Sequence, residues 1–287
     1  LVPVAYHDPE KGKLGYARSV RYGFFNEGGF VAMCKWYRAY AMKTGVLKTL
    51  REKMKTRPQL ERIAGAPDFW GIDPTICLQI RRMGVRHAIV NGEWNAEQME
   101  RVKALGYLVS RYDNYEDMLE GDTAEFERGR IPQDVVKNAD GSLMTAWVTW
   151  DKKTQFMKRC SVLYEGVARL QVPKELKIRP YNARFIDVTT ACGLRECYDE
   201  VHPCTRREDR AARQKLARYI ADELKLVLGG EHGRWWGVPY YDYWEGMQSG
   251  GFYSWPAGHV GINLPEKRED IGKDYLEFGI GEKRRVP

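Results

Sequence analysis

Several patterns are missing from this sequence, and each absence excludes a class of protein. No apolar run approaches the ~18 residues that a membrane-spanning helix needs. No Gly-x-Gly-x-x-Gly follows the first predicted strand and no phosphate-loop pattern occurs, which argues against a nucleotide-binding doubly wound sheet. A Gly-x-Ser-x-Gly elbow is also missing, so the sequence gives no support to serine-nucleophile chemistry of that type.

Cysteine is sparse, with six residues in the chain. Cys34, Cys77 and Cys160 stand alone in the sequence, a pattern more typical of buried free thiols than of a disulfide framework. A second group offers the soft donor atoms of a zinc site: Cys192, Cys197, His202 and Cys204. Its spacing, Cys-x4-Cys-x4-His-x-Cys, departs from the usual paired short loops. We therefore expect a buried cysteine cluster, no metal and no cofactor.

Aromatic residues are abundant, and they indicate a folded core. The 287 residues include 9 Trp, 17 Tyr and 9 Phe. A disordered chain has far fewer of these large side chains, which a folded core can bury. The length suits two ordinary domains or one large domain.

The charge balance favours cations, with 46 basic and 39 acidic residues and a net charge of +7. Cations mostly alternate with anions, as in residues 206–210, and the most basic stretch (residues 35–62) lies in a predicted helical region. A solvated helical face explains that stretch, so we predict no nucleic-acid partner and no membrane partner.

The first 65 residues divide into two predicted parts. Residues 1–6 and 16–22 read as strands around a turn at 8–12, and we assign residues 1–30 to the end of an N-terminal β domain. Residues 31–65 form a helical linker with a break at Thr44 and Gly45. Since the sequence begins at Leu1 rather than at methionine, we expect a piece of a longer protein, and the compartment cannot be read from it.

Residues 66–287 show short apolar runs that alternate with helical patterns. Strands are predicted at residues 69–71, 88–90, 107–110, 184–188 and 226–228, with weaker candidates at 237–240 and 260–263. Asn95 with Gln98, and Thr205 with Glu208, are capping boxes that begin two helices. Residues 114–180 show little regular pattern. This alternation predicts an α/β fold, a (β/α)8 TIM-type barrel that is truncated because only five or six strands are counted.

Polar side chains follow the predicted strands, where a (β/α) barrel holds its reacting groups. They are Asn91, Glu93, Arg111, Asp113, Asp187, Glu231 and Asp242. Asp113 has an equally good interpretation as a helix cap. Asp187 and Glu231 end neighbouring strands and would point into one mouth. Paired carboxylates are what acetal cleavage requires.

Aromatic residues crowd the segment around Glu231. They are Trp235, Trp236, Tyr240, Tyr241, Tyr243 and Trp244. Core packing explains some of them, but we expect Trp235, Trp236 and Tyr241 to provide flat platforms for a sugar ring. His232 either donates a hydrogen bond to the substrate or to a carboxylate, or has a local structural role.

Three motifs resemble glycoside hydrolase family 129 and, more distantly, family 101. They are residues 185–188, residues 230–236 and residues 241–247. The resemblance spans residues 30–265 and is strongest over 184–250. It implies a retaining α-N-acetylgalactosaminidase acting on mucin-type O-glycans or the Tn sugar, with a barrel behind an N-terminal β-sandwich. It also implies that Asp187 is the nucleophile and Glu231 the acid/base. From their positions at strand ends, and not from the resemblance, we expect five further residues beside the substrate: Asn91, Glu93, Arg111, Asp113 and Asp242.

Two other functions stay open at this point. One is a non-catalytic carbohydrate-binding barrel that keeps the aromatic platforms. The other is a glycosidase that acts on another hexoside. All of these functions have a carbohydrate partner, a glycan or a glycopeptide.

Overall fold

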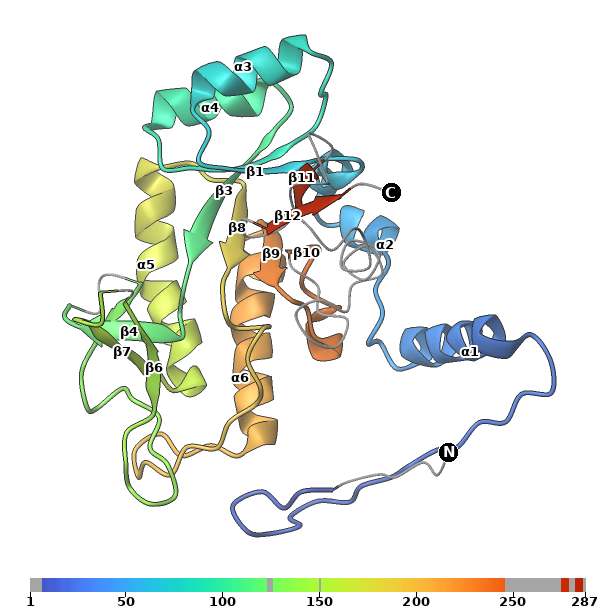
Figure 1. Ribbon diagram of the computed structural model, residues 1–287, viewed down its shortest axis with the longest axis vertical. Helices are drawn as coiled ribbons and strands as arrows, with labels where there is room; N and C mark the ends of the chain where they lie inside the picture. Colours follow the sequence, from blue (N-terminus) through green and yellow to red (C-terminus); the bar gives the residue numbers. More distant parts are fainter. Residues whose placement is uncertain (1–6, 123–125, 150, 246–274, 279–281, 286–287) are drawn as a thin grey trace.

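The computed structural model describes residues 7–122, 126–149, 151–245, 275–278 and 282–285. Its centre is a six-stranded sheet in the order β1-β2-β3-β8-β9-β10 (Figure 1). The strands are β1 (Asp68–Trp70), β2 (Ile89–Asn91), β3 (Leu108–Asp113), β8 (Ala183–Ile186), β9 (Val227–Glu231) and β10 (Tyr243–Glu245). Each neighbouring pair is parallel. The predicted α/β class with a parallel sheet is therefore confirmed.

Four longer helices accompany this sheet. They are α3 (Pro74–Arg82), α4 (Ala96–Ala104), α5 (Tyr164–Ile178) and α6 (Arg206–Arg218), which continues through a π-helical turn at Tyr219–Glu223. Helix α3 packs on α4, and α5 packs on α6 (Figure 1). Both predicted capping boxes are present: the side chains of Asn95 and Thr205 accept from the third residue of α4 and α6.

The sheet curls, so that its two edge strands come into side-chain contact. The indole Nε1 of Trp70 in β1 donates to Oε1 of Glu245 in β10 at 2.6 Å. The Trp70 ring also packs edge-on against Phe185 of β8, with ring centroids 5.2 Å apart. Six parallel strands curled in this way form a partial TIM-type barrel, as expected from the strand count.

A short helical segment closes the N-terminal end of this partial barrel. It comprises α2 (Leu50–Met54) and the 3₁₀ helix η1 (Pro58–Ile63). Leu60 of η1 is fully buried against the first residues of four strands, namely Ile89, Leu108, Ala183 and Val227. Burying a leucine in this way contributes roughly 1.5–3 kcal/mol. The opposite end of the strands is thus left for a site.

Residues 114–180 are more regular than the sequence analysis expected. They contain a four-stranded sheet in the order β5-β4-β7-β6. Its strands are β4 (Asp117–Glu120), β5 (Arg128–Gly129), β6 (Thr145–Val148) and β7 (Gln155–Lys158), and the 3₁₀ helix η2 (Ser161–Leu163) and α5 follow. These strands are too short to show a period of two, and α5 carries Pro173 in its interior, which hides the helix from a propensity argument.

The N-terminal region differs from its prediction. Helix α1 (Gly29–Lys43) ends before Thr44, and Gly45 adopts φ 74°, as the predicted break requires. Residues 16–22, predicted as a strand, form none, and over residues 7–28 the structure gives a single isolated bridge between Glu10 and Lys13. Figure 1 shows this segment and α1 reaching away from the sheet. Residues 1–6 lie outside the described part, so the β-sandwich and the domain boundaries at 30 and 65 stay predictions.

The strand predicted at residues 237–240 is also wrong. The 3₁₀ helix η4 (Trp235–Gly237) overlaps the first residue of the predicted strand. The observed strand β10 begins at Tyr243, three residues after the end of the predicted one. Pro239 lacks the N–H that a central strand would donate, which explains the displacement. The candidate strand at 260–263 lies outside the described residues. Strands β11 (Tyr275–Phe278) and β12 (Glu282–Arg285) pair antiparallel.

None of the helices in the described part of the chain has the length and apolar character needed to cross a membrane.

Candidate active site

Strand alternation places Asp187 and Glu231 on the inner face of the curled sheet. Ala183 of β8 and Val227 of β9 face inward, since both pack with η1. A period of two then turns Asp187 and Glu231 inward at the carboxyl ends of these strands. Gly229 of β9 is opposite Phe185 of β8, so the two acids follow in matching positions.

The carboxyl groups of Asp187 and Glu231 lie close enough to interact. Burial first, and then the charge of Asp187 and hydrogen bonding to its side chain, raise the pKa of Glu231 to about 7. A raised pKa favours the protonated form of Glu231, which is the form that a general acid needs. The hydroxyl of Tyr112 donates to Asp187 at 2.6 Å. Tyr112 and Glu231 thus flank the Asp187 carboxyl group at the ends of neighbouring strands.

Backbone strain adjoins the pair at Val188. Its φ of 62° lies in the left-handed region, which a β-branched residue rarely adopts. Strain of this kind costs on the order of 1–3 kcal/mol and persists where the surrounding structure imposes it. In this conformation the Val188 N–H donates to Oε2 of Glu231 at 3.1 Å. The strained turn therefore joins the end of β8 to the carboxyl group of β9.

A second pair of acids, Asp68 and Glu245, lies where β1 meets β10. Burial first, and then the neighbouring Glu245, raise the pKa of Asp68 to about 9. The Asn91 amide donates to Oδ1 of Asp68 at 2.6 Å. Asn91, expected beside the substrate, is buried and holds this pair in place.

Arg111 and Asp113 lie on the helix-facing side of β3, away from Asp187 and Glu231. Arg111 donates to Glu175 of α5 at 2.8 Å and also pairs with the largely exposed Glu93. Asp113 is fully buried and accepts two hydrogen bonds from Arg184, at 2.6 and 2.9 Å. The structure thus places Glu93, Arg111 and Asp113 in ion pairs between sheet and helices rather than in the mouth.

Asp242 lies at the beginning of β10, on the side that η1 closes. Its side chain is wholly buried and pairs with Arg57, whose Nη2 lies 2.9 Å from Oδ1, and with Lys53 of α2 at 3.5 Å. It also accepts from the Leu228 N–H at 2.9 Å. The structure therefore uses Asp242 to hold α2 and η1 against the sheet.

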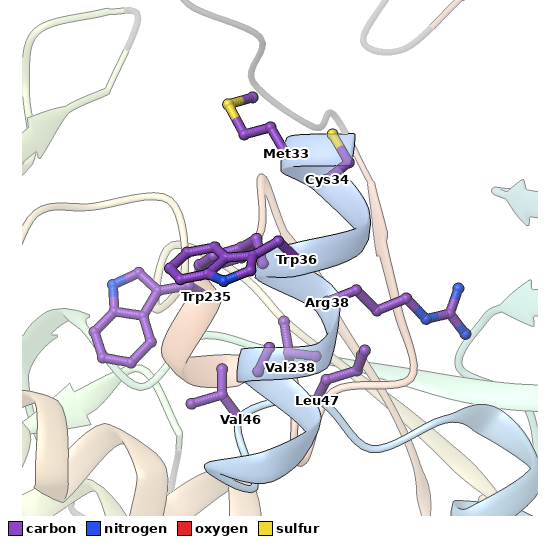
Figure 2. Close-up of a pocket in the computed structure, with 10 residues that line it drawn as sticks. Met33, Cys34, Trp36, Arg38, Val46, Leu47, Trp235 and Val238 are labelled. Carbon is purple, nitrogen blue, oxygen red and sulfur yellow. The ribbon is translucent and has the colours of Figure 1, made fainter. Parts of the chain in front are cut away.

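The predicted aromatic platforms separate into buried and exposed rings. Tyr241 and Trp236 are buried, and Tyr241 stacks on Trp244 with centroids 5.8 Å apart. Trp235 is 54% exposed and lines a cavity of about 480 Å³ together with Trp36 and Met33 of α1 (Figure 2). Among the three, Trp235 alone presents its ring to a cavity of the described residues.

His232 follows Glu231 in a left-handed conformation, with φ 59°. Its Nε2 lies 3.3 Å from Oε1 of Glu231, and its N–H donates to the carbonyl of Glu245 at 2.7 Å. The side chain therefore contacts the acid pair directly, and the backbone ties β9 to β10.

Sequence reasoning missed four inward-facing residues at this mouth. They are Asp68, Trp70, Tyr112 and Glu245. The signal was in the alternation: Leu108, Ser110 and Tyr112 share one face of β3, whereas Arg111 and Asp113 share the other.

Comparisons with known proteins bear on the family and the fold. Residues 80–267 match the family described as glycosyl hydrolases related to the GH101 family, GH129. The complex of the α-N-acetylgalactosaminidase NagBb from Bifidobacterium bifidum with Gal-NHAc-DNJ is similar, with a TM-score of 0.71 and 20% identity. That alignment covers 83% of this chain and 45% of NagBb. The GalNAc complex of NagBb gives a TM-score of 0.68 and 21% identity over 83% of this chain and 46% of that one. No curated protein sequence matches this chain.

The chain thus spans less than half the length of these solved structures, and at this identity they support the fold alone. The family match covers well over half of the sequence. From this match, the chain belongs to glycoside hydrolase family 129.

Proposed function

We propose that this chain carries the catalytic pair of a retaining α-N-acetylgalactosaminidase, with Asp187 as the nucleophile and Glu231 as the acid/base. The closeness of the two carboxyl groups at neighbouring strand ends carries this proposal, because Asp187 helps to raise the pKa of Glu231 into the range of a general acid. Membership of family 129 supports hydrolysis of a glycosidic bond.

In the first step Asp187 attacks the anomeric carbon while Glu231 gives its proton to the leaving oxygen. The glycosidic bond breaks as the bond from Asp187 to the sugar forms. Glu231, now ionised, takes a proton from water, and that water displaces Asp187 from the same face as the departed aglycone. Two inversions give net retention.

The proximity of the acids favours retention over inversion. Retaining enzymes hold their carboxyl groups about 5–5.5 Å apart, whereas inverting enzymes leave about 6.5–9.5 Å for a water molecule. Asp187 lies close enough to Glu231 to raise its pKa, which suits the shorter separation.

Tyr112 and Val188 assist this chemistry without taking part in it. The Tyr112 hydroxyl donates to Asp187 at 2.6 Å, which orients the carboxylate. The Val188 N–H donates to Oε2 of Glu231 at 3.1 Å, which orients this carboxyl group.

The proposed substrate is an α-linked N-acetylgalactosamine on a glycan or glycopeptide. NagBb, the similar solved protein, is named an α-N-acetylgalactosaminidase and was solved with GalNAc. A different hexoside is the second candidate for the same pair.

The decisive experiment measures turnover of an aryl α-N-acetylgalactosaminide by the complete gene product. Asp187→Ala should abolish turnover, and Glu231→Ala should lose it for poor leaving groups but regain it with azide, giving an α-glycosyl azide. Glu93→Gln serves as the control because Glu93 is an exposed acid paired with arginines.

Full turnover in the Asp187 or Glu231 variant would contradict the assignment. Binding of the sugar without turnover of any glycoside by the wild-type protein would favour the carbohydrate-binding barrel instead.

A further inference from the structure

A cluster of sulfur and nitrogen donors lies outside the candidate active site, at the loop between β8 and α6. Cys197 and Cys204 face each other across an antiparallel bridge, in which the N–H of each donates to the carbonyl of the other at 2.8 and 3.1 Å. Residues opposite one another in such a pair present their side chains to the same side. His202 comes from the turn between them, and Cys160 comes from the segment joining β7 to η2.

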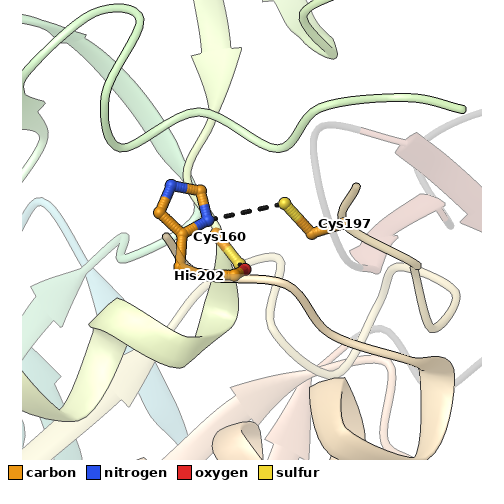
Figure 3. A group of neighbouring side chains, drawn as sticks. All are labelled: Cys160, Cys197 and His202. Carbon is orange, nitrogen blue, oxygen red and sulfur yellow. Dashed lines mark hydrogen bonds between the residues drawn. The ribbon is translucent and has the colours of Figure 1, made fainter. Parts of the chain in front are cut away.

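Three of the four donor atoms lie close enough to one another to bind one ion, and the fourth, Sγ of Cys204, adjoins that of Cys160. The ligand atoms of Cys160, Cys197 and His202 are all within 4.8 Å of one another (Figure 3). Nδ1 of His202 is 3.5 Å from Sγ of Cys197, and Sγ of Cys204 is 4.0 Å from Sγ of Cys160. Zinc bonded tetrahedrally to thiolate and imidazole, at about 2.3 and 2.0–2.1 Å, separates S from S by about 3.8 Å and S from N by about 3.6 Å. Both separations in the cluster are near these values.

The outer contacts of the cluster suit metal ligands. Nε2 of His202 lies 2.7 Å from the Gln133 carbonyl. Since a carbonyl can only accept, Nε2 carries the proton and Nδ1 keeps its lone pair for a ligand bond. The Lys137 N–H points at Sγ of Cys197 at 3.4 Å, a contact that stabilises a thiolate. Metal-bound histidines and thiolates are usually oriented by outer hydrogen bonds of these kinds.

The surroundings of the cluster are apolar. All four side chains are buried, and Val136, Met144 and Leu163 pack against the cysteines. Soft thiolate donors select zinc over calcium or magnesium, which prefer oxygen ligands. A closed set of four protein ligands is the arrangement of a structural site rather than a catalytic one.

We propose that Cys160, Cys197, His202 and Cys204 bind a structural zinc ion. This set replaces the one that the sequence spacing suggested. Cys160, expected to stand alone, takes the place of Cys192, which lies beside Glu116 instead. Sequence spacing could not find it, because Cys160 is 37 residues before Cys197.

The zinc ion joins the β8–α6 loop to the small sheet. The loop begins directly after Asp187 and Val188, and β7 precedes Cys160. The ion would therefore fix the loop that emerges from the strained turn of the candidate active site. The proposal does not depend on the proposed hydrolase activity, because its measurements are of metal content and stability.

The test is the metal content of the full chain, purified under reducing conditions without chelators and dialysed. We expect about one zinc ion per chain by mass spectrometry of the metals. Blocking the thiols of the wild-type protein with a mercurial should release that zinc to a colorimetric chelator. Cobalt(II) chloride added to the zinc-depleted protein should give the thiolate charge-transfer and d–d absorption of a tetrahedral site.

Matched variants locate the ion. Cys197→Ser and Cys204→Ser should lose the zinc, and a chelator should lower the Tm of the wild-type protein but not theirs. Cys77→Ser is the control, since Cys77 is a buried thiol in a different core cluster and should keep the full metal content.

Three results would overturn the proposal. The first is a folded, reduced wild-type protein that takes up neither zinc nor cobalt, which would make the cluster an apolar packing of thiols. The second is a mass two hydrogens lower with Cys160 and Cys204 joined as a disulfide. The third is loss of zinc from Cys77→Ser as well, which would show that the ion binds elsewhere.

Discussion

The buried acids around the parallel sheet fall into two groups that differ in their partners. Asp113 and Asp242 are each paired with an arginine, on the helix-facing side and at the closed end of the sheet. Asp187 interacts with Glu231, and Asp68 with Glu245, on the inner face. An arginine partner favours the ionised carboxylate and stabilises the fold, whereas an acid partner raises a pKa and costs stability. The acids without arginine partners are therefore the ones whose positions need a functional explanation.

The largest expected effect is on catalysis by the inner pair. Glu231→Gln keeps the shape of the side chain but cannot donate a proton to the leaving group. We expect kcat/KM for a poorly activated α-N-acetylgalactosaminide to fall by about 10²–10⁴-fold, the range that general acid catalysis supplies. Substrates with an activated leaving group should lose much less in kcat, since they need little protonation. Equal falls in rate for both kinds of substrate would show that Glu231 is not the acid.

Substitution of an acid that is paired with an arginine should have its largest effect on the stability of the fold. Asp113→Asn removes one of the two acids that pair with the buried Arg184 and leaves Glu175 as the other, so we expect the free energy of unfolding to fall by about 3 kcal/mol, the lower end of the range for a broken buried pair. Denaturant unfolding of the two variants side by side measures the contrast, because Glu231→Gln should not lose stability in this way. A similar loss in both variants would remove the distinction between the two groups.

The pH dependence should sharpen the same contrast. With the pKa of Glu231 raised to about 7, kcat/KM should fall roughly tenfold per pH unit above that value as the acid loses its proton. An unfolded chain releases this proton near pH 4.5, so stability should also fall between about pH 4.5 and 7, where the folded state still holds it. Above that window Glu231→Gln should be more stable than the wild-type protein. An activity that stays constant to pH 9 would contradict the raised pKa.

The smallest expected effect concerns the strained turn. Val188→Gly removes the β-branched side chain from a left-handed conformation, and we expect a gain of about 1 kcal/mol in unfolding free energy. Lys225→Gly is the matched control, at a left-handed residue with φ 58° outside the mouth and without a β-branch. A Val188→Gly variant that gains less than the control would show that the turn carries no special strain.

The sequence predicted the parallel sheet and the inner pair because both follow from local rules. Capping boxes fixed the start of α4 and α6, and the positions of Asp187 and Glu231 at the ends of neighbouring strands predicted that both face one mouth. The side chains of Arg111 and Asp113 face the helices rather than the inside of the sheet. The sequence could not predict this side, because it does not fix which residues of β3 face inward.

Other features depend on contacts between distant segments. Asp242 pairs with Arg57, which is 185 residues earlier, and Cys160 joins Cys204 from 44 residues away. No local pattern records such contacts. The four-stranded sheet of β4 to β7 was not predicted for a different reason. Its strands have two to four residues, which is too short to establish a period of two in the sequence.

The most direct test of the catalytic pair is the anomeric form of the first product. Proton NMR spectra, recorded as the complete gene product hydrolyses an aryl α-N-acetylgalactosaminide, distinguish the α and β sugars before they interconvert. The closeness of Asp187 and Glu231 predicts that α-N-acetylgalactosamine forms first and the β-anomer rises only by mutarotation. Initial release of the β-anomer would contradict the pairing, because inversion requires a water molecule between the two carboxyl groups.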